Sequence, residues 1–254
     1  MISGLSILFV TMLAAQNPPQ AANGFRPPDK PTASEPVKVM SPETRGDILM
    51  ARKMYREAIE TYKEGPNDSA VLANKTGIAY HQLMELDSAK KQYERAIKLD
   101  PKYAEAINNL GTVYYAHKSY RRAVKEYKKA LRITPESAAF LSNLGTAYYA
   151  RRQYKEASLM YEKALQIDPQ IFDRRSSMGT TLQERSVEER AKFHYILAKT
   201  YAKAGDTEHA LEYIRKALEE GFKERQKFKT DPEFAKLQDN AEFKLILATE
   251  QKVI

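Results

Sequence analysis

The sequence predicts an all-α fold, organised as an array of helical hairpins with a C-terminal capping helical segment. Ten glycines stand against 41 lysines and arginines and 33 aspartates and glutamates in 254 residues, a balance typical of helical proteins. Residue types also recur every 34 positions through the middle of the chain. Because 43% of the residues are hydrophobic, the chain can form a sizeable packed core.

Six columns of residues carry the 34-residue period, and each column agrees in three consecutive copies. The columns are Gly77, Gly111 and Gly145; Tyr80, Tyr114 and Tyr148; Ala89, Ala123 and Ala157; Tyr93, Tyr127 and Tyr161; Ala96, Ala130 and Ala164; and Pro101, Pro135 and Pro169. Six columns in phase, joined by the similar strings NNLGTVYYA and SNLGTAYYA, indicate an internal repeat rather than chance.

Each copy is expected to fold as two helices. In the middle copy an i, i+3, i+4, i+7 stripe marks the first helix, at Ile107, Leu110, Gly111 and Tyr114. After a break near Lys118, a second helix ends before Pro135 and is lined by Ala123, Tyr127 and Ala130. The small residues let the two backbones approach closely, and the tyrosines fill the space between them.

This combination of L-G-x-x-Y, alanine, an aromatic residue four positions later and a closing proline resembles the tetratricopeptide repeat. The likeness is strongest over residues 70–171, although the chain has no tryptophan and Thr76 replaces the leucine before the first glycine. The resemblance implies a right-handed superhelical solenoid of antiparallel helix pairs. It also implies that the first helices line a concave groove for extended peptides or partner helices.

Weaker copies extend the array on both sides of the three clear ones. Upstream, the second-helix pattern recurs at Tyr55, Ala58 and Tyr62, so residues 42–171 are predicted to form four hairpins. Downstream, two registers compete: one continues the columns through Gly179, Ala191, Tyr195 and Ala198. The other, which we favour, places a fifth hairpin at 191–222 around Leu197, Ala198, Tyr201, Ala210 and Ala217.

The favoured register makes residues 172–190 an insertion. Ser186 and Glu189 form an S-x-x-E capping box, which predicts a helix start near Val187. After the fifth hairpin, residues 223–254 are expected to cover the apolar side of the last repeat, with Asp231 or Asp239 as helix N-caps. The apolar residues at helical spacing are Phe234, Leu237, Phe243, Ile246 and Leu247. A free amphipathic partner helix is the alternative for this segment.

The N-terminus predicts export. Residues 1–15 contain no charged side chain and have the length of a signal peptide, although no lysine or arginine precedes the apolar run. Residues 16–41 hold six prolines without apolar periodicity and are expected to be a disordered linker. We therefore expect a periplasmic or cell-envelope protein, with an uncleaved anchor or a cytoplasmic location as alternatives. The absence of cysteine excludes disulfides but does not choose a compartment.

No enzymatic signature is found in the sequence. It has no P-loop, G-x-G-x-x-G, H-E-x-x-H or G-x-S-x-G motif. The four histidines lack metal-ligand spacing: His81, His117, His194 and His209. We expect no catalysis, cofactor, metal or small-molecule substrate.

Recognition of another protein, through a peptide segment or a helix, is the function that remains. A second stripe lies next to each core stripe, one residue further round the first helix, and the resemblance places it in the groove. Its residues are Asn74, Ile78, His81, Asn108, Thr112, Tyr115, Ser142, Thr146 and Tyr149, with Tyr195 and Lys199 in the fifth hairpin. Tyr115 and Tyr149 could instead pack between successive first helices. The resemblance implies that chaperone-binding members of the family use lysine and asparagine in the groove to hold a terminal carboxylate. This kind of site is disfavoured here, because Glu43 and Asp47 occupy the matching positions of the first repeat.

The alternative to peptide binding in the groove is binding through a basic stripe. Residues 104–137 hold seven lysines and arginines against three glutamates, so they carry +4 of the net charge of +8. The stripe consists of Lys118, Arg121, Arg122, Lys125, Lys128, Lys129 and Arg132. It could meet a polyanion or associate weakly with a membrane surface, whereas an ordinary solvated helix face is the simpler reading. Nucleic acid is not an expected partner.

Overall fold

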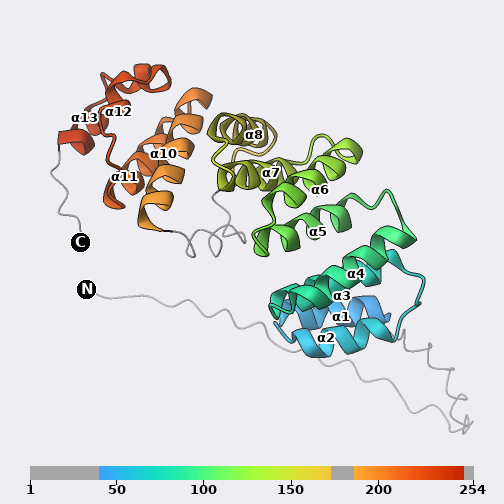
Figure 1. The fold of residues 1–254 in the computed structure, drawn as a ribbon. Helices are drawn as coiled ribbons and strands as arrows, with labels where there is room; N and C mark the ends of the chain where they lie inside the picture. The colour runs from blue at the N-terminus through green and yellow to red at the C-terminus, as the bar shows by residue number, and fades with distance from the viewer. Residues whose placement is uncertain (1–39, 173–185, 249–254) are drawn as a thin grey trace, which may run out of the picture. The chain divides into compact units, whose positions relative to one another are not determined.

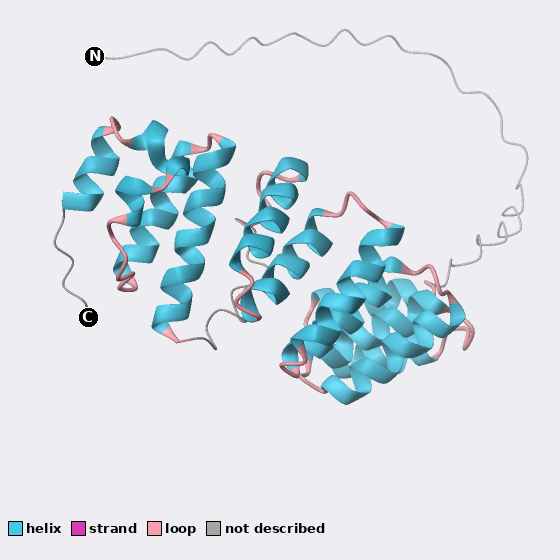
Figure 2. Cartoon of the chain, turned by 45° about the horizontal axis from the view of Figure 1, so that its top comes forward, coloured by secondary structure: helices cyan, strands magenta, loops and turns pink. Residues whose placement is uncertain are grey.

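This computed structural model describes residues 40–172 and 186–248, and every regular element in these ranges is helical (Figures 1 and 2). The elements are α1 (Pro42–Ala51), α2 (Tyr55–Lys63), α3 (Ala70–Gln82), α4 (Leu86–Leu99), α5 (Ala104–Ala116), α6 (Tyr120–Ile133), α7 (Ala138–Ala150), α8 (Tyr154–Ile167), α10 (Val187–Ala204), α11 (Thr207–Glu219), α12 (Lys227–Thr230), the 3-10 helix η1 (Pro232–Leu237) and α13 (Ala241–Ala248). The expected signal peptide, nearly all of the expected linker and most of the expected insertion lie outside the described residues.

Consecutive helices pack as hairpins, and consecutive hairpins pack on one another. The pairs are α1 with α2, α3 with α4, α5 with α6, α7 with α8, and α10 with α11. Each second helix also contacts the first helix of the next pair, and α3, α5 and α7 contact each other in succession. The all-α solenoid of helix pairs predicted from the sequence is confirmed.

Local sequence explains where the helices begin and turn. Helix α10 starts at Val187, as the capping box predicts, because the Oγ of Ser186 accepts the N–H of Glu189 at 3.2 Å. Its pairing with α11 around Gly205 is the register favoured from the sequence. The other four hairpin turns each contain one non-glycine residue in the left-handed region, with φ between 57° and 61°: Lys53, Met84, Lys118 and Arg152.

The C-terminal segment packs on the last hairpin through aromatic rings. η1 contacts α10, and α13 contacts α11. The rings of Phe228, Phe234 and Phe243 are at most 1% exposed, so this segment shares the core of the array. Of the two expected N-caps, Asp231 holds the N-cap position of η1, although its side chain makes no capping hydrogen bond, whereas α13 is capped by a different residue. Because α13 begins at Ala241, its cap is Asn240, whose Oδ1 accepts the N–H of Phe243 at 2.9 Å.

Candidate functional site

The predicted groove residues divide into two sets in the structure. A buried set lies at most 7% exposed, and it consists of Asn74, Asn108, Ser142, Tyr149 and Tyr195. A half-buried set remains at the surface of α3, α5, α7 and α10: Ile78, His81, Thr112, Tyr115, Thr146 and Lys199. The buried set cannot present its side chains to a partner in this conformation. This correction to the predicted groove follows from contacts between repeats.

An amide ladder links successive first helices. The Nδ2 of Asn109 donates to the Oδ1 of Asn74 at 3.0 Å, and the Nδ2 of Asn143 donates to the Oδ1 of Asn108 at 3.0 Å. Asn74 also donates to the hydroxyl oxygen of Tyr103 at 3.3 Å. Asn74 and Asn108 therefore join repeats, and the half-buried amides of Asn109 and Asn143 lie at the surface.

Asn109 and Asn143 are site residues that the sequence reasoning missed. They stand 34 positions apart, directly before the Leu-Gly of their repeats, so the period itself contained the signal.

Thr112 and Thr146 also hold the hairpins together. The Oγ1 of Thr112 accepts the hydroxyl proton of Tyr127 at 3.2 Å, and the Oγ1 of Thr146 accepts that of Tyr161 at 3.3 Å. Each threonine thus satisfies a buried second-helix tyrosine fifteen positions later. Ile78 occupies the same position in the second hairpin and offers no acceptor to Tyr93. The two threonines are structural residues whose edges reach the surface.

Tyr149 packs between repeats, as the alternative to the groove reading supposed. Its ring lies 5.4 Å from Phe193 and 5.3 Å from Tyr154, and its hydroxyl donates to the backbone oxygen of Glu189 at 2.5 Å. The equivalent Tyr115 lies 5.2 Å from Tyr120 and remains half-buried. Helix α10 explains the difference because Phe193 and Glu189 belong to it.

The fifth hairpin's expected groove residues are engaged by the C-terminal segment. Tyr195 stacks on Phe222 at 4.4 Å, and its hydroxyl hydrogen-bonds to Asp231. The Nζ of Lys199 lies 2.9 Å from Asp231 and 3.2 Å from Glu233. The chain itself therefore satisfies Tyr195 and Lys199, which the sequence could not reveal because Asp231 lies outside the repeat pattern.

At the N-terminal end of the array, helix α1 contributes acidic side chains that pair with α3. Lys75 of α3 pairs with Glu43 at 2.8 Å and with Asp47 at 2.5 Å, and Tyr62 donates to Asp47 at 2.7 Å. Burial alone would raise the pKa of Asp47, but hydrogen bonds from Lys75 and Tyr62 lower it overall. Both carboxylates are therefore already ion-paired within the chain.

Between these two ends lies a group of uncharged residues, with the exposed Glu105 one turn before Asn109 on α5. We call it the first-helix face and define it by seven half-buried residues: Ile78, His81, Asn109, Thr112, Tyr115, Asn143 and Thr146. Burial lowers the pKa of the His81 imidazole, so this side chain is neutral at neutral pH. The face combines amide, hydroxyl and aromatic groups over α3, α5 and α7.

Family models for the tetratricopeptide repeat match residues 77–118, 113–151, 138–171 and 191–220. The chain belongs to the tetratricopeptide-repeat family. It is 33% identical over 72 residues to the Arabidopsis thaliana protein "Tetratricopeptide repeat domain-containing protein PYG7, chloroplastic". That match covers 26% of this chain and about a quarter of the length of that relative (24%).

Solved tetratricopeptide-repeat structures also resemble the chain. A crystal structure of MamA protein has 21% identity and a TM-score of 0.49, and the match covers 75% of this chain and 93% of that one. YrrB, whose structure is titled "a TPR protein with an unusual peptide-binding site", has 18% identity and a TM-score of 0.47, with 71% and 84% covered.

The basic stripe lies on α6 and the turn before it. Six of its residues are exposed, whereas Lys129 is half-buried and pairs with Glu126 at 2.7 Å. Within the described ranges no group of three or more histidine, aspartate and glutamate residues could hold a metal ion. None of the helices described there is long and apolar enough to cross a membrane.

Proposed function

We propose that this tetratricopeptide-repeat protein is a non-catalytic scaffold that binds a segment of another protein on the first-helix face. The observation that carries the proposal is the uncharged, hydrogen-bonding character of this face across α3, α5 and α7. Second helices such as α6 present charged side chains instead. An uncharged polar face suits a peptide backbone, which carries one donor and one acceptor per residue.

The amide ladder supplies specific contact points for that backbone. Asn143 is the last amide, and its Oδ1 accepts no hydrogen bond from any residue that the structure describes. A backbone N–H of the partner would donate to it. Neighbouring helices lie about 8–10 Å apart, and an extended chain rises about 3.3 Å per residue. Two residues of the partner, about three positions apart, would therefore meet Asn109 and Asn143.

The partner segment is expected to be extended and to carry an apolar side chain. The half-buried ring of Tyr115 and the side chain of Ile78 flank the amides and supply the apolar contact. The two ends of the array are covered by the chain's own α1 carboxylates and C-terminal segment. The binding region thus comprises the second to fourth hairpins.

Export to the periplasm or cell envelope is part of the proposal. It rests on the uncharged run within residues 1–15 and the proline-rich stretch that follows. N-terminal sequencing of the native protein should begin near Gln16. Intact Met1 in a soluble cytosolic fraction would contradict it.

Site-specific photo-crosslinking in native cells tests the binding surface. A photoreactive amino acid replaces Asn109 or Asn143 in one arm, and exposed Lys91 or Lys163 of the second helices α4 and α8 in the control arm. We expect the two asparagine positions to capture the same protein and the two lysine positions not to capture it. Equal capture from both arms, or capture only from the lysine positions, would contradict the proposal.

A further inference from the structure

Helix α6 begins differently from the other long second helices. Acidic residues occupy the first turns of α2, α4, α8 and α11, where they complement the positive end of the helix dipole: Glu57, Asp87, Glu156 and Glu208. The first turn of α6 has no acidic residue and holds Arg121 and Arg122 instead. Positive side chains at a positive helix end repel, so this arrangement favours an external anion.

The same arginines line a surface depression at the hairpin-turn edge. Its lining residues are Lys118, Ser119, Tyr120, Arg121, Arg122 and Arg151. Arg151 comes from the next hairpin, so four cations from two repeats converge there. None of the four forms an ion pair with a described residue. At the preceding hairpin edge, in contrast, Arg56 pairs with Glu85 at 3.2 Å. Next to the depression, the imidazole of His117 lies 3.7 Å from the carboxylate of Asp87.

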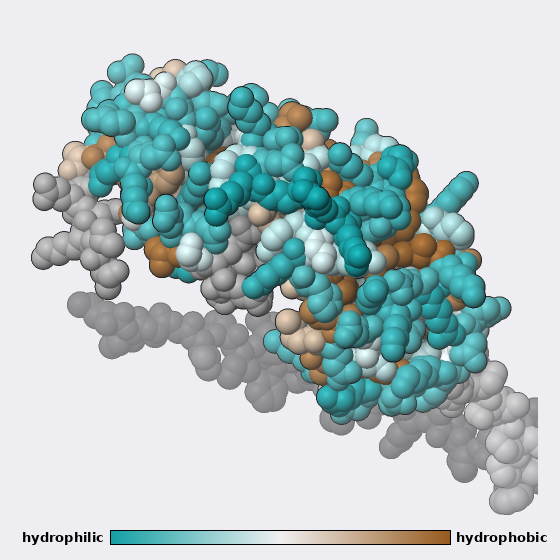
Figure 3. Space-filling view, viewed as in Figure 1, coloured by the Kyte–Doolittle hydropathy of each residue, from teal (hydrophilic) through white to brown (hydrophobic). Residues whose placement is uncertain are grey.

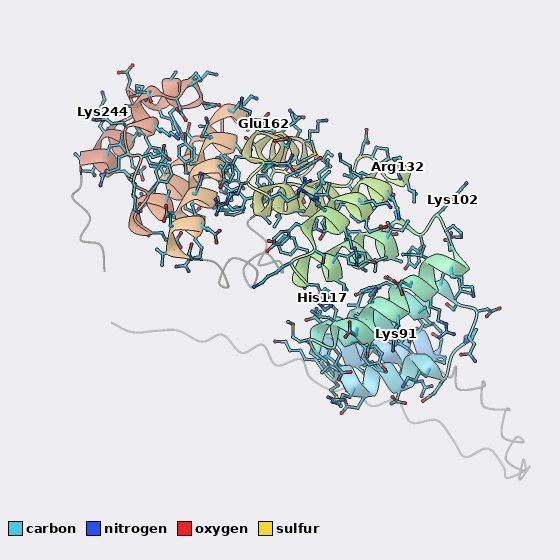
Figure 4. The ribbon with its side chains drawn as sticks, viewed as in Figure 1. Lys91, Lys102, His117, Arg132, Glu162 and Lys244 are labelled. Atoms are coloured by element: carbon cyan, nitrogen blue, oxygen red, sulfur yellow. The ribbon has the colours of Figure 1, made fainter. Side chains whose placement is uncertain are left out.

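From this depression the positive charge continues along α6. Lys125, Lys128 and Arg132 are exposed, and within the described ranges they have no carboxylate within ion-pair distance. Figure 4 labels His117, in the turn before α6, and Arg132, in its last turn, which mark the ends of this line of charge. Figure 3 shows a band of the most hydrophilic residues over α6 and the adjoining α7–α8 hairpin. A helix of 14 residues extends about 21 Å.

The excess of positive charge is greatest on α6, because carboxylates offset more of the lysines and arginines on the flanking second helices. On α4, Lys90 lies 3.7 Å from Glu94. On α8, Glu156 is exposed, and Glu162 pairs with Lys203 at 2.7 Å. A membrane would present a broad plane of anions to all three helices, and two of them would bring acidic groups to it. A narrow line matches a linear ligand better.

We propose that the α6 line, defined as Lys118, Arg121, Arg122, Lys125, Lys128, Arg132 and Arg151, binds an acidic polypeptide segment. Alternate side chains of an extended peptide lie about 6.6–6.8 Å apart, close to the rise of about 6 Å between helix positions i and i+4, such as Arg121 and Lys125. The guanidinium groups in the depression can each bind a carboxylate with two hydrogen bonds.

Single-stranded nucleic acid fits this surface less well. Such ligands stack their bases on accessible aromatic rings. Of the two rings on α6, Tyr127 is only 2% exposed, and Tyr120 is half-buried and packs 5.2 Å from Tyr115. This acidic-peptide site is separate from the first-helix face, and either could exist without the other.

Fluorescence anisotropy on the whole protein tests the proposal. The probe is a fluorescein-labelled ten-residue peptide of alternating glutamate and glycine, titrated at low and at physiological salt. The test variant changes four residues of the α6 line: Arg121→Gln, Arg122→Gln, Lys125→Gln and Lys128→Gln. The matched control loses the same charge from α4 and α8, at exposed lysines without ion pairs to described residues: Lys91→Gln, Lys98→Gln, Lys155→Gln and Lys163→Gln.

We expect the test variant to bind the peptide at least about ten-fold more weakly than the parent, since each exposed pair contributes modestly and four are removed. The control should keep most of the affinity, and circular dichroism should show both variants folded. An equal loss of affinity in the control would show that net charge alone drives binding, and would overturn the proposal. No binding by the parent, or tighter binding to a single-stranded oligonucleotide or to phosphatidylserine vesicles that the test variant loses, would overturn the proposal.

Discussion

Gly111 and Tyr127 lie in direct contact across the third hairpin: a Cβ atom on Gly111 would come within 2.7 Å of Cε1 of the Tyr127 ring. Gly77 with Tyr93 and Gly145 with Tyr161 repeat this relationship, at 2.6 Å and 2.5 Å. Glycine in a helix interior costs about 1 kcal/mol relative to alanine. Its use here is explained by the fully buried ring that it accommodates.

Replacing Gly111 by alanine should therefore destabilise the protein although alanine is the better helix former. We expect a loss of about 1–3 kcal/mol in the free energy of unfolding, because the methyl group displaces a buried ring. Urea denaturation followed by circular dichroism measures it. Gly205→Ala is not a matched control, since Gly205 has a φ of 84° and would be strained for another reason.

The fifth hairpin suggests a rescue for Gly111→Ala. The corresponding positions there hold Ala198 and Ile214, both fully buried, so a larger first-helix residue accompanies a smaller second-helix residue. Adding Tyr127→Ile to Gly111→Ala should recover part of the lost stability. If Gly111→Ala alone is as stable as the parent, the close contact does not constrain the hairpin.

Met84→Gly should stabilise the protein. Met84 has a φ of 60° and is 64% exposed, so its side chain adds a backbone cost without burying much surface. Relief of left-handed strain is worth about 1 kcal/mol, partly offset by the greater flexibility of glycine in the unfolded chain. Thermal denaturation should show a raised midpoint for Met84→Gly and little change for Met84→Ala. Similar midpoints for all three proteins would show that the turn is unstrained.

Tyr149 should contribute to the junction between the fourth and fifth hairpins. Tyr149→Phe removes the hydroxyl that donates to Glu189 and should lower the free energy of unfolding by about 0.5–1.5 kcal/mol. Tyr149→Ala also removes a 3% exposed ring and should lower it by about 3–5 kcal/mol. Urea denaturation of the two variants checks the order. An unchanged midpoint for Tyr149→Ala would mean that the ring does not pack as described.

The C-terminal segment should loosen in acid. Burial alone would raise the pKa of Asp231, but hydrogen bonds from Tyr195 and Lys199 lower it below the ordinary value of 3.8. The ionised carboxylate therefore stabilises the fold above that value, and the stabilisation is lost as the pH falls through the lowered pKa. The protection of residues 227–248 from hydrogen exchange, relative to the intrinsic rate at each pH, should fall in that range. Asp231→Asn should show faster exchange already at neutral pH, and identical profiles for both proteins would refute this role.

The repeat period predicted most of the fold because the same contacts recur in every copy. Glycine, alanine and tyrosine columns specify which residues face each other within a hairpin, and proline marks where each hairpin ends. The N-cap of α13 was missed because Asp239 and Asn240 are both good caps by residue type. Only the observed helix start, at Ala241, distinguishes them.

The site was predicted less well because the residues that cover it are distant in sequence. Asn74 is buried by partners 29 and 35 positions away, and Tyr195 by one 36 positions away. A helical stripe identifies a face but not the neighbour that packs on it. The period marks the column of Asn109 and Asn143, whereas nothing periodic pointed from Tyr195 to Asp231.

The affinity of the protein captured from Asn109 and Asn143, measured with purified components, tests the central claim most directly. Asn143→Ala combined with Tyr115→Ala should weaken this binding at least about ten-fold, since it removes one hydrogen bond and one aromatic contact. Lys163→Ala should leave the affinity unchanged, and melting temperatures should show all the proteins folded. Parental affinity in the folded double variant would contradict the assignment of the first-helix face as the binding surface.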